Sequence, residues 1–146
     1  MSSSCIFCKI IKGEIPALKL FETEKTLAFM DIQPTAAGHA LVIPKYHGAK
    51  LHNIPDEHLS ELLPIAKKIA VALELAIDSP EGAGYNVLQN NGRIAHQMVD
   101  HVHVHLIPKR DGNTGLGVRW PLDQNGADRV KEIHAKLVEK IEASKM

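Results

Sequence analysis

The stretch over residues 97–108 constrains the fold more than any other part of the chain, because polar and apolar residues alternate through its centre. Residues 101–106 are His-Val-His-Val-His-Leu. Strict alternation is typical of a β-strand with one buried face, on which residues of the same face lie about 7 Å apart. The three histidines therefore share one face of a predicted strand, while the valines and the leucine point into a core.

Four explanations compete for this row of imidazoles. The first is a solvated sheet face without a further role, and the second, an expression tag, is excluded by the interleaved valines and the mid-chain position. Because neutral imidazole is the commonest protein ligand for metal ions, the third is a metal site made of three histidines. In the fourth, one ring is a nucleophile or base and its neighbours orient it.

Four ordered blocks of the sequence resemble the histidine-triad (HIT) family of nucleotide hydrolases and transferases. They are residues 29–32, 38–47 and 89–92, and the triad followed by Leu106-Ile107. The resemblance covers about residues 5 to 110 and is closest to the Hint branch, in its fungal or bacterial form. It implies an α+β fold of the HIT type, with an antiparallel sheet of about five strands, a long central helix and a C-terminal helix.

Length and charge bound the remaining alternatives. At 146 residues the chain fits one domain, in which we expect a disordered N-terminus over 1–4, a HIT domain over 5–112 and a C-terminal segment over 113–146. Seventeen basic residues balance seventeen acidic ones, so nothing indicates nucleic acid or a membrane as a partner. Without a signal peptide or an apolar run of about 20 residues, we expect a cytoplasmic protein, or one that is also nuclear.

Apolar patterns and turn residues predict the other elements. Strands are expected over 17–22, 26–31, 39–44 and 85–89. The longest helix should begin at Pro55 and carry an apolar stripe to Ala76, followed by a loop over 78–84. Pro64 inside this helix should kink it, at a cost of about 3 kcal/mol. A second helix is expected over 127–144.

Cys5 and Cys8 form a C-x-x-C pair with several interpretations. The alternatives are half of a structural zinc site, two free buried thiols, a disulfide and a redox dithiol. The redox dithiol needs a preceding strand, which the serine-rich start does not supply. A zinc ion needs two more ligands, and only histidines are left to provide them. Resemblance to HIT proteins that carry this pair implies His47 and His101.

A purine nucleotide is the small-molecule partner that the resemblance implies. Asp31 matches a carboxylate that accepts hydrogen bonds from the ribose, although a turn former is the alternative for a residue just past a strand. Asn90 matches an asparagine beside the α-phosphate and is otherwise a turn residue. Any apolar residue of the implied nucleotide site could equally belong to the core. The implied site consists of Phe7, Ile10, Phe29, Asp31, Ile32, His39, Asn90, Gln97 and Met98.

The row of histidines implies a mechanism for a nucleoside 5′-phosphate ester or amide. The central ring, His103, can reach phosphorus in line, and with a reference pKa of about 6.5 it is mostly neutral at pH 7. In the family the nucleophile holds its proton on the ring nitrogen that faces away from phosphorus. The backbone carbonyl of the first histidine, here His101, accepts a hydrogen bond from this N–H. A nucleotidyl-histidine forms and is hydrolysed by water. His105 and Gln97 would bind phosphate oxygens.

Two features depart from the family pattern. Many members carry Ser or Thr where this chain has Met98, and because a thioether cannot donate a hydrogen bond, we expect slower leaving-group protonation or another leaving-group preference. Trp120-Pro121 matches a pair that Hint proteins carry near the active site, but animal Hint proteins end soon after it, so the C-terminal helix differs from them.

The predicted function is hydrolysis of nucleoside 5′-phosphoramidates, such as the AMP amide or AMP joined to an amine or lysine. Zinc is structural in this prediction, and the chemistry needs no cofactor. One alternative is a dinucleoside polyphosphate hydrolase of the Fhit-like branch. Another is a nucleotide-binding regulatory or scaffold module with vestigial turnover. The resemblance also implies a homodimer.

Overall fold

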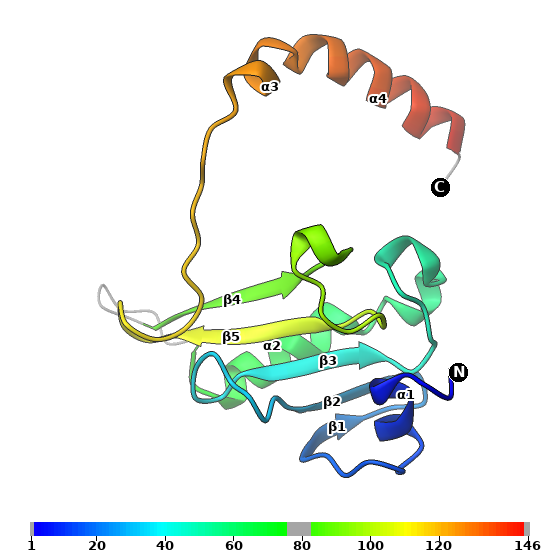
Figure 1. Cartoon of the computed structure of the whole chain (residues 1–146), viewed down its shortest axis with the longest axis vertical. Coiled ribbons are helices and arrows are strands. Elements are labelled where there is room, and N and C mark those ends of the chain that lie inside the picture. The colour runs from blue at the N-terminus through cyan, green and yellow to red at the C-terminus, as the bar shows by residue number, and fades with distance from the viewer. Residues whose placement is uncertain (1, 76–82, 145–146) are drawn as a thin grey trace. The chain divides into compact units, whose positions relative to one another are not determined.

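The computed structural model describes residues 2–75 and 83–144 (Figure 1). The chain divides into two compact units, Met1–Leu116 and Gly117–Met146, which are described separately below. The first unit contains the sheet. Within the described ranges, no helix has the length and apolarity that a membrane span requires.

Five antiparallel strands form one sheet in the order β1-β2-β3-β5-β4. Leu41 of β3 pairs with His105 of β5, and Leu88 of β4 pairs with the same histidine from the other side. The predicted α+β fold with a five-stranded antiparallel sheet is therefore confirmed. The strands are β1 (Lys19–Glu22), β2 (Thr26–Met30), β3 (Ala40–Pro44), β4 (Gly84–Gln89) and β5 (Val104–Lys109).

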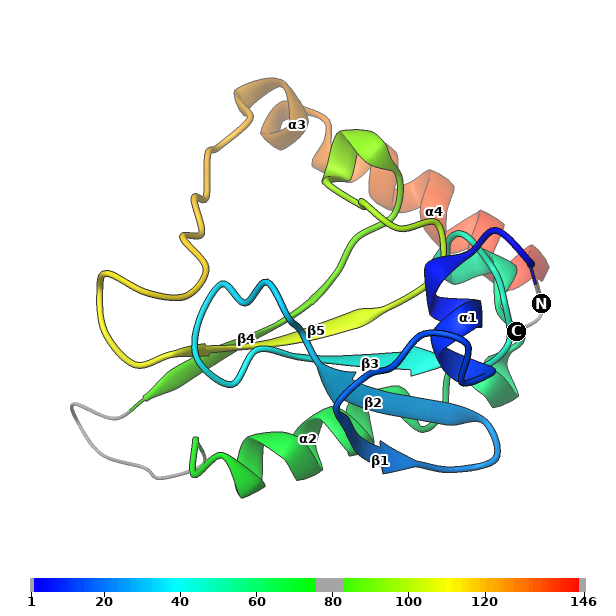
Figure 2. The same ribbon diagram turned by 60° about the horizontal axis from the view of Figure 1, so that its bottom comes forward.

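A different helix covers each face of the sheet (Figure 2). Helix α2 (Leu62–Ala72) packs on the face that carries Val42 and Val104. Helix α1 (Ile6–Ile11) packs on the opposite face, which carries Leu41. Because Leu41 pairs with His105, this histidine projects from the α1 face. The side chains packed around α1 are Phe7, Ile10, Leu27, Phe29, Leu41 and Ile43.

Helix α2 begins later than the sequence predicted. Short 3₁₀ turns η1 (Leu51–Asn53) and η2 (Asp56–His58) precede it. Pro64 is consequently its third residue, where a backbone N–H has no partner within the helix, so the predicted kink and its energetic cost do not arise. Glu74 ends the helix with a φ of 60°. Ala76 and most of the expected 78–84 loop lie outside the described residues.

Strand β5 also begins later than the alternating pattern suggested. His101 and His103 lie in the extended segment before it, so the prediction of one strand under all three histidines was wrong. The N–H of Val102 donates to Gly48 at 2.9 Å and thereby joins this segment to a loop. The glycine also leaves room for Ile54, because a Cβ on Gly48 would lie 2.5 Å from Ile54 Cδ1. Val102, Val104 and Leu106 are buried as expected.

The second unit contains α3 (Gln124–Asp128) and α4 (Val130–Ser144) rather than the single helix predicted over 127–144. Asp123 caps α3 by accepting the N–H of Asn125 at 3.0 Å. No residue of this unit is buried in the part that the structure describes. The exposed apolar side chains of α4 are Val130, Ile133, Leu137, Val138 and Ile141.

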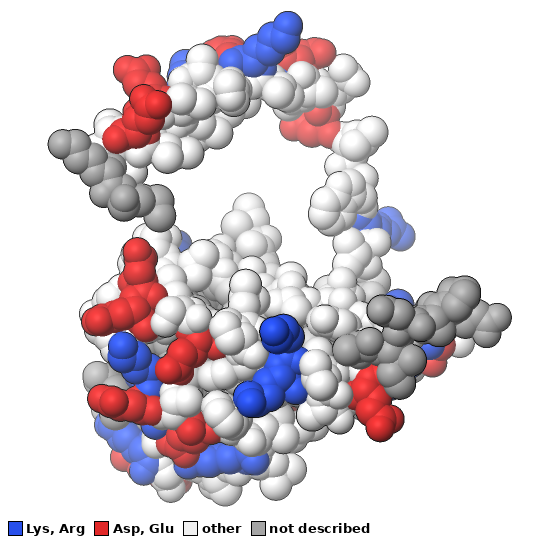
Figure 3. Space-filling view, turned by 180° about the vertical axis from the view of Figure 1, so that it is seen from behind, with Lys and Arg blue, Asp and Glu red and all other residues white. Residues whose placement is uncertain are grey.

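Charged side chains of both signs intermingle on the face shown in Figure 3, in keeping with a net charge of zero.

The remaining 3₁₀ turn, η3 (Arg93–Ala95), lies between β4 and the histidine segment in the chain. Gln97 immediately follows this turn and is almost completely buried.

Candidate active site and metal centre

The ring of His103 is held in one tautomer. Its Nδ1–H donates to the backbone carbonyl of His101 at 2.7 Å, so in the neutral ring Nε2 carries the lone pair. Among the described residues this Nε2 has no hydrogen-bond partner, and it is not one of the side-chain atoms sealed off from solvent. Although His103 as a whole is only 5% exposed, its Nε2 thus keeps some contact with solvent. Burial lowers the pKa of His103, which keeps that lone pair free at neutral pH.

The ring of His105 has the opposite tautomer, set by a chain of two hydrogen bonds. The N–H of Thr35 donates to Nδ1 of His39 at 3.0 Å, which leaves the proton of neutral His39 on Nε2. This Nε2–H lies 2.9 Å from Nδ1 of His105 and donates to it. His105 must then carry its own proton on Nε2. A bare nitrogen on His103 and a protonated nitrogen on His105 thus belong to rings whose centroids are 4.8 Å apart.

The histidines of this site are neutral at pH 7. Burial, and after it the neighbouring His103 and His39, lower the pKa of His105 to about 4. Burial also lowers the pKa of His39, against the opposing attraction of Asp31. A neutral donor favours a phosphate group with one negative charge over a terminal dianion, since dianions are usually bound by cations or metals.

Asp31 has the role of a turn former and keeps one carboxylate oxygen free of it. Its Oδ1 accepts the N–H of Gln33 at 2.8 Å, which is the role of a turn former. Its Oδ2 lies 3.5 Å from His39 Nε2 and stays available as an acceptor for hydroxyl groups. The carboxylate is therefore fixed by the turn and points its second oxygen toward the histidines.

The apolar residues predicted to hold the base divide into core and surface. Phe7 packs edge-on against Phe29 with a centroid distance of 5.7 Å and against His103 at 5.1 Å. Ile10 is buried in the same cluster, so ordinary core packing accounts for it. Ile32 is 83% exposed and Met98 is 61% exposed.

Gln97 has a different role from the phosphate contact that we expected. Its side chain is 1% exposed, and its Nε2 hydrogens are donated to the carbonyls of Ala49 and Val99. Its Oε1 accepts the N–H of Gly92 at 2.7 Å. With both amide hydrogens in use, Gln97 joins three backbone segments around the site. Asn90 donates to the carbonyl of His96 at 3.3 Å.

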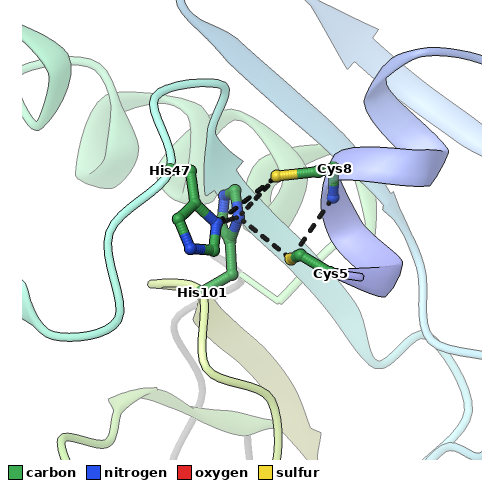
Figure 4. A group of neighbouring side chains, drawn as sticks. All are labelled: Cys5, Cys8, His47 and His101. Atoms are coloured by element: carbon green, nitrogen blue, oxygen red, sulfur yellow. Dashed lines mark hydrogen bonds between the residues drawn. The ribbon is translucent and has the colours of Figure 1, made fainter. Parts of the chain in front are cut away.

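Four side chains from three separate parts of the chain converge beside this site (Figure 4). Nδ1 of His101 lies 3.5 Å from Sγ of Cys5, 3.6 Å from Sγ of Cys8 and 3.2 Å from Nδ1 of His47. Sγ of Cys8 lies 3.4 Å from Nδ1 of His47. The four ligand atoms all lie within 4.8 Å of one another.

These distances fit a tetrahedral zinc ion. Zinc bonds of about 2.3 Å to sulfur and about 2.05 Å to nitrogen give ligand edges of about 3.6 Å between S and N and about 3.3 Å between two nitrogens. The tautomer fits as well, because Nε2–H of His101 donates to the Pro44 carbonyl at 2.8 Å and leaves a lone pair on Nδ1. A Cys₂His₂ donor set of this kind is typical of structural zinc.

A second group, Asp31, His39 and His105, is less suitable for a metal ion. The distance of 2.9 Å between its two nitrogens is that of a hydrogen bond and is shorter than a tetrahedral edge. Coordination through Nε2 of neutral His39 would move the proton of this ring to Nδ1, where it would meet the N–H of Thr35. The two histidines of this group are therefore joined by a hydrogen bond, whereas the cysteine-containing group offers lone pairs to a metal ion.

A family model described as HIT domain matches residues 12–112. The chain belongs to the HIT family. Among the relatives of this HIT protein, adenosine 5′-monophosphoramidase HNT1 of Candida albicans is 63% identical over 140 residues, which cover 95% of this chain and 92% of that protein. The protein of the same name in Saccharomyces cerevisiae is 58% identical over 144 residues, covering 99% and 87%.

Solved structures of HIT proteins share the fold. The crystal structure of a histidine triad nucleotide-binding protein from Candida albicans is 62% identical, with a TM-score of 0.90 over 97% of this chain and 99% of that chain. A HIT family protein from Bacillus anthracis is 37% identical, with a TM-score of 0.84 over 96% and 99% of the two chains. The family that the sequence resembled is therefore confirmed.

Sequence reasoning missed two backbone partners of this HIT site. The N–H of Thr35 sets the tautomer of His39, and the carbonyl of Gly48 holds the segment beside His103. Neither contact depends on a side chain of that residue, so residue identity carries no signal for it. The turn-forming residues Pro34 and Gly38 around Thr35 indicate a loop there, but not the direction of its N–H groups.

Proposed function

We propose that this protein hydrolyses nucleoside 5′-phosphoramidates to AMP and an amine, with His103 as the nucleophile. The observation that carries the proposal is the pair of opposite tautomers on His103 and His105, whose rings are 4.8 Å apart. One Nε2 can attack phosphorus and the other can donate a proton to the departing nitrogen. Two relatives at 63% and 58% identity bear the name adenosine 5′-monophosphoramidase.

In the first step the lone pair of His103 Nε2 forms a bond to phosphorus, and the bond from phosphorus to the amine nitrogen breaks. The electron pair of that bond stays on nitrogen, which takes the Nε2 proton of His105. His105 can recover a proton from His39 through the 2.9 Å hydrogen bond. The His101 carbonyl stabilises the positive charge that develops on the attacking ring.

In the second step water attacks phosphorus and the bond to His103 Nε2 breaks. The proton that water loses goes to the His105–His39 pair, which gave up one proton in the first step, and free AMP leaves. Splitting one displacement into two steps is the advantage of a covalent intermediate. The ring of His103 returns to the tautomer in which Nδ1–H faces the His101 carbonyl.

Recognition of the nucleotide rests on the groups around this pair. Oδ2 of Asp31 is the acceptor that we assign to the ribose hydroxyls, and the edge of Phe7 together with the exposed Ile32 is assigned to the purine. Asn90 and Met98 flank the phosphate and the leaving group in this assignment. The neutral histidines favour a singly charged phosphoramidate over a polyphosphate chain.

The metal centre belongs to the same proposal. Cys5, Cys8, His47 and His101 would hold a zinc ion, and their distances support this assignment. Bound there, the ion supplies a cross-link between segments rather than reaction chemistry, because the protein side chains occupy all four positions.

We also propose a homodimer that acts in the cytoplasm, with the nucleus as a second compartment in the alternative. Large apolar side chains that stay exposed in a single copy, such as Ile94, Trp120 and Leu122, support an interface. Sedimentation at micromolar concentration would show twice the mass of the 16.0 kDa chain, whereas a single-chain mass would contradict the dimer.

A substrate panel tests the proposed activity. We expect faster AMP release from the AMP amide and from AMP joined to an alkyl amine than from diadenosine triphosphate. A His103→Ala variant should lose at least about 10³-fold in kcat while still binding AMP. His52→Ala, a change of an exposed histidine in η1, should match the wild type. Faster cleavage of diadenosine triphosphate would favour the polyphosphate hydrolase, and binding without turnover would favour the regulatory module.

A further inference from the structure

We infer that Cys5, Cys8 and His47 are positioning residues for the nucleophile, so that filling of the metal centre and binding of the nucleotide are coupled. The inference rests on the metal centre and the nucleophile of the proposed function. Two separate links connect the four ligands to His103, one through the backbone and one through α1.

The backbone link passes through His101. Its ring nitrogen Nδ1 faces the other three ligands, while its own carbonyl accepts Nδ1–H of His103 at 2.7 Å. The peptide that fixes the tautomer of the nucleophile therefore belongs to a metal ligand. A second backbone contact belongs to the same link. The carbonyl of Gly48, the residue after His47, accepts the N–H of Val102, the residue after His101. The His47 loop and the nucleophile segment thus lie side by side.

The second link passes through α1. Cys5 caps this helix, since its Sγ accepts the N–H of Cys8 at 3.4 Å. Phe7 lies between the two cysteines and contacts the rings of His101 and His103 at centroid distances of 5.9 and 5.1 Å. A helix of six residues is too short to persist alone, so tertiary anchors must hold it. The two thiolates are anchors at one end of the same turn that carries Phe7.

Loss of the cation should loosen both links. Without it, the Nδ1 atoms of His47 and His101 face each other at 3.2 Å with two lone pairs, unless a proton lies between them. The thiols of Cys5 and Cys8 lie within 3.6 Å of one or both of these nitrogens, and their S–H groups are weak donors that replace metal bonds only in part. With these weaker contacts the loop can separate from the histidine segment, which would shift the carbonyl that holds His103.

Anchors independent of the metal oppose this loosening. Nε2–H of His101 donates to Pro44, and Phe7 is packed among buried side chains of β2 and β3. If these contacts suffice, the site keeps its geometry without the metal. The change in AMP affinity on loss of the metal therefore measures how strongly the metal centre and the nucleotide site are coupled.

The test compares His47→Ala with His52→Ala in the full chain. His47 is a ligand that makes no contact with His103 in the part of the chain described, whereas His52 is an exposed histidine five residues further on. Three readouts are needed: zinc content, AMP affinity by calorimetry, and the NMR signal of the His103 Nδ1 proton, which the His101 carbonyl protects. Amide exchange of β2, β3 and β5 reports whether the sheet remains folded.

We expect wild type and His52→Ala to bind one zinc ion per chain, to bind AMP equally and to show the Nδ1 proton. His47→Ala should lose zinc, bind AMP at least about tenfold more weakly, and lose the protected Nδ1 proton while the sheet amides stay protected. Should His47→Ala not fold, the same readouts are followed while zinc is removed from the wild type with a chelator and then restored.

Unchanged AMP affinity and an unchanged Nδ1 proton after zinc loss would overturn the inference, as would wild-type protein that binds no zinc. The substrate panel stands apart from this result. If the protein binds AMP and zinc but does not cleave phosphoramidates, the proposed activity fails and the coupling is still decided by affinity and NMR.

Discussion

His103 and His105 differ in the position of one proton, and the backbone decides that difference. A carbonyl, that of His101, fixes the proton of His103 on Nδ1, and an N–H, that of Thr35, acts through His39 to fix the proton of His105 on Nε2. Two chemically identical side chains thereby become a nucleophile and a proton donor. Their environments separate the roles, although burial lowers the pKa of both rings.

The hydrogen-bond relay through His39 predicts a dependence on the leaving group. In His39→Asn, the side-chain amide oxygen can replace His39 Nδ1 as the acceptor of the Thr35 N–H. No group then replaces His39 Nε2–H as the donor to His105, so His105 loses its fixed tautomer. We expect cleavage of an alkyl phosphoramidate to slow about 100-fold, because an amine must be protonated to leave. Cleavage of an aryl phosphate ester, whose leaving group needs no proton, should change less than about fivefold.

His39→Gln is the matched variant for this experiment. Its amide places a donor where Nε2 faces His105, so it should recover much of the rate with the alkyl phosphoramidate. Equal losses on both leaving groups in His39→Asn would indicate a general disturbance of the site and would contradict the relay.

For individual residues, the sequence predicted which side chains lie near one another better than it predicted their hydrogen-bond partners. The triad and the cysteine pair were predicted because their residue types limit the chemistry available to them, and Asp31 was predicted from the family resemblance. The contacts of Gln97 were not predicted, since an amide N–H donates equally well to a phosphate and to a backbone carbonyl. Its true partners come from loops that are distant in the chain, and no local pattern reports them.

Among the elements, the strands were predicted more closely than the helices. Continuous or alternating apolar runs fix the length of a strand, and β2, β3 and β4 lie within about two residues of their predicted positions. The apolar stripe before α2 has helical spacing, but Pro64 cannot continue a helix that begins at Pro55, and the chain forms a 3₁₀ turn there first. Breaking the helix at Glu61 resolves the conflict.

The end of α2 offers a test of that element. Glu74 has a φ of 60°, and the N–H of Leu75 donates to Ala70 at 3.0 Å, as in helices that end on a left-handed residue. Glycine adopts this conformation without the steric cost that a side chain brings. Glu74→Gly should therefore raise the free energy of unfolding by about 0.5–1 kcal/mol, measured by urea denaturation.

Glu74→Ala is the control, because alanine keeps the Cβ and should leave the stability within about 0.5 kcal/mol of the wild type. A glycine variant that is less stable than the alanine variant would contradict backbone strain at Glu74, because both variants remove the charge and differ only in the Cβ.

For the whole molecule, the buried histidines predict a loss of stability in acid. His105 has a pKa of about 4 in the folded protein against an ordinary value of 6.5. Because the folded pKa is the lower one, the unfolded chain binds more protons between these values, so stability falls as pH decreases from 6.5 toward 4. His39 and His103, whose pKa values burial also lowers, act in the same direction.

Urea denaturation at pH 7 and pH 5 would measure this effect. The midpoint should fall at pH 5 in the wild type and fall less in His105→Gln, which removes one of the titrating rings. A wild-type midpoint that stays constant or rises between pH 7 and pH 5 would contradict the buried, neutral state of these histidines.

The C-terminal unit shows where sequence reasoning ended. Helical spacing correctly indicated helix near residues 130–144, but the break at Arg129 was not foreseen, since Arg129 itself is a good helix former. What covers the apolar side chains of α4 depends on other parts of the molecule or on another copy. That the segment over 113–146 belongs to the same domain as the HIT unit remains a prediction.

The central claim is that a nucleotide becomes covalently attached to Nε2 of His103. Rapid mixing with an alkyl phosphoramidate of AMP that is radiolabelled in its adenosine, followed by quenching in base and peptide mass spectrometry, tests it most directly. We predict an adenylylated peptide that carries the AMP on His103, appears before free AMP and decays at the rate of AMP release. Steady release of AMP with no adduct at any time, or with the adduct on His101 or His105, would contradict it.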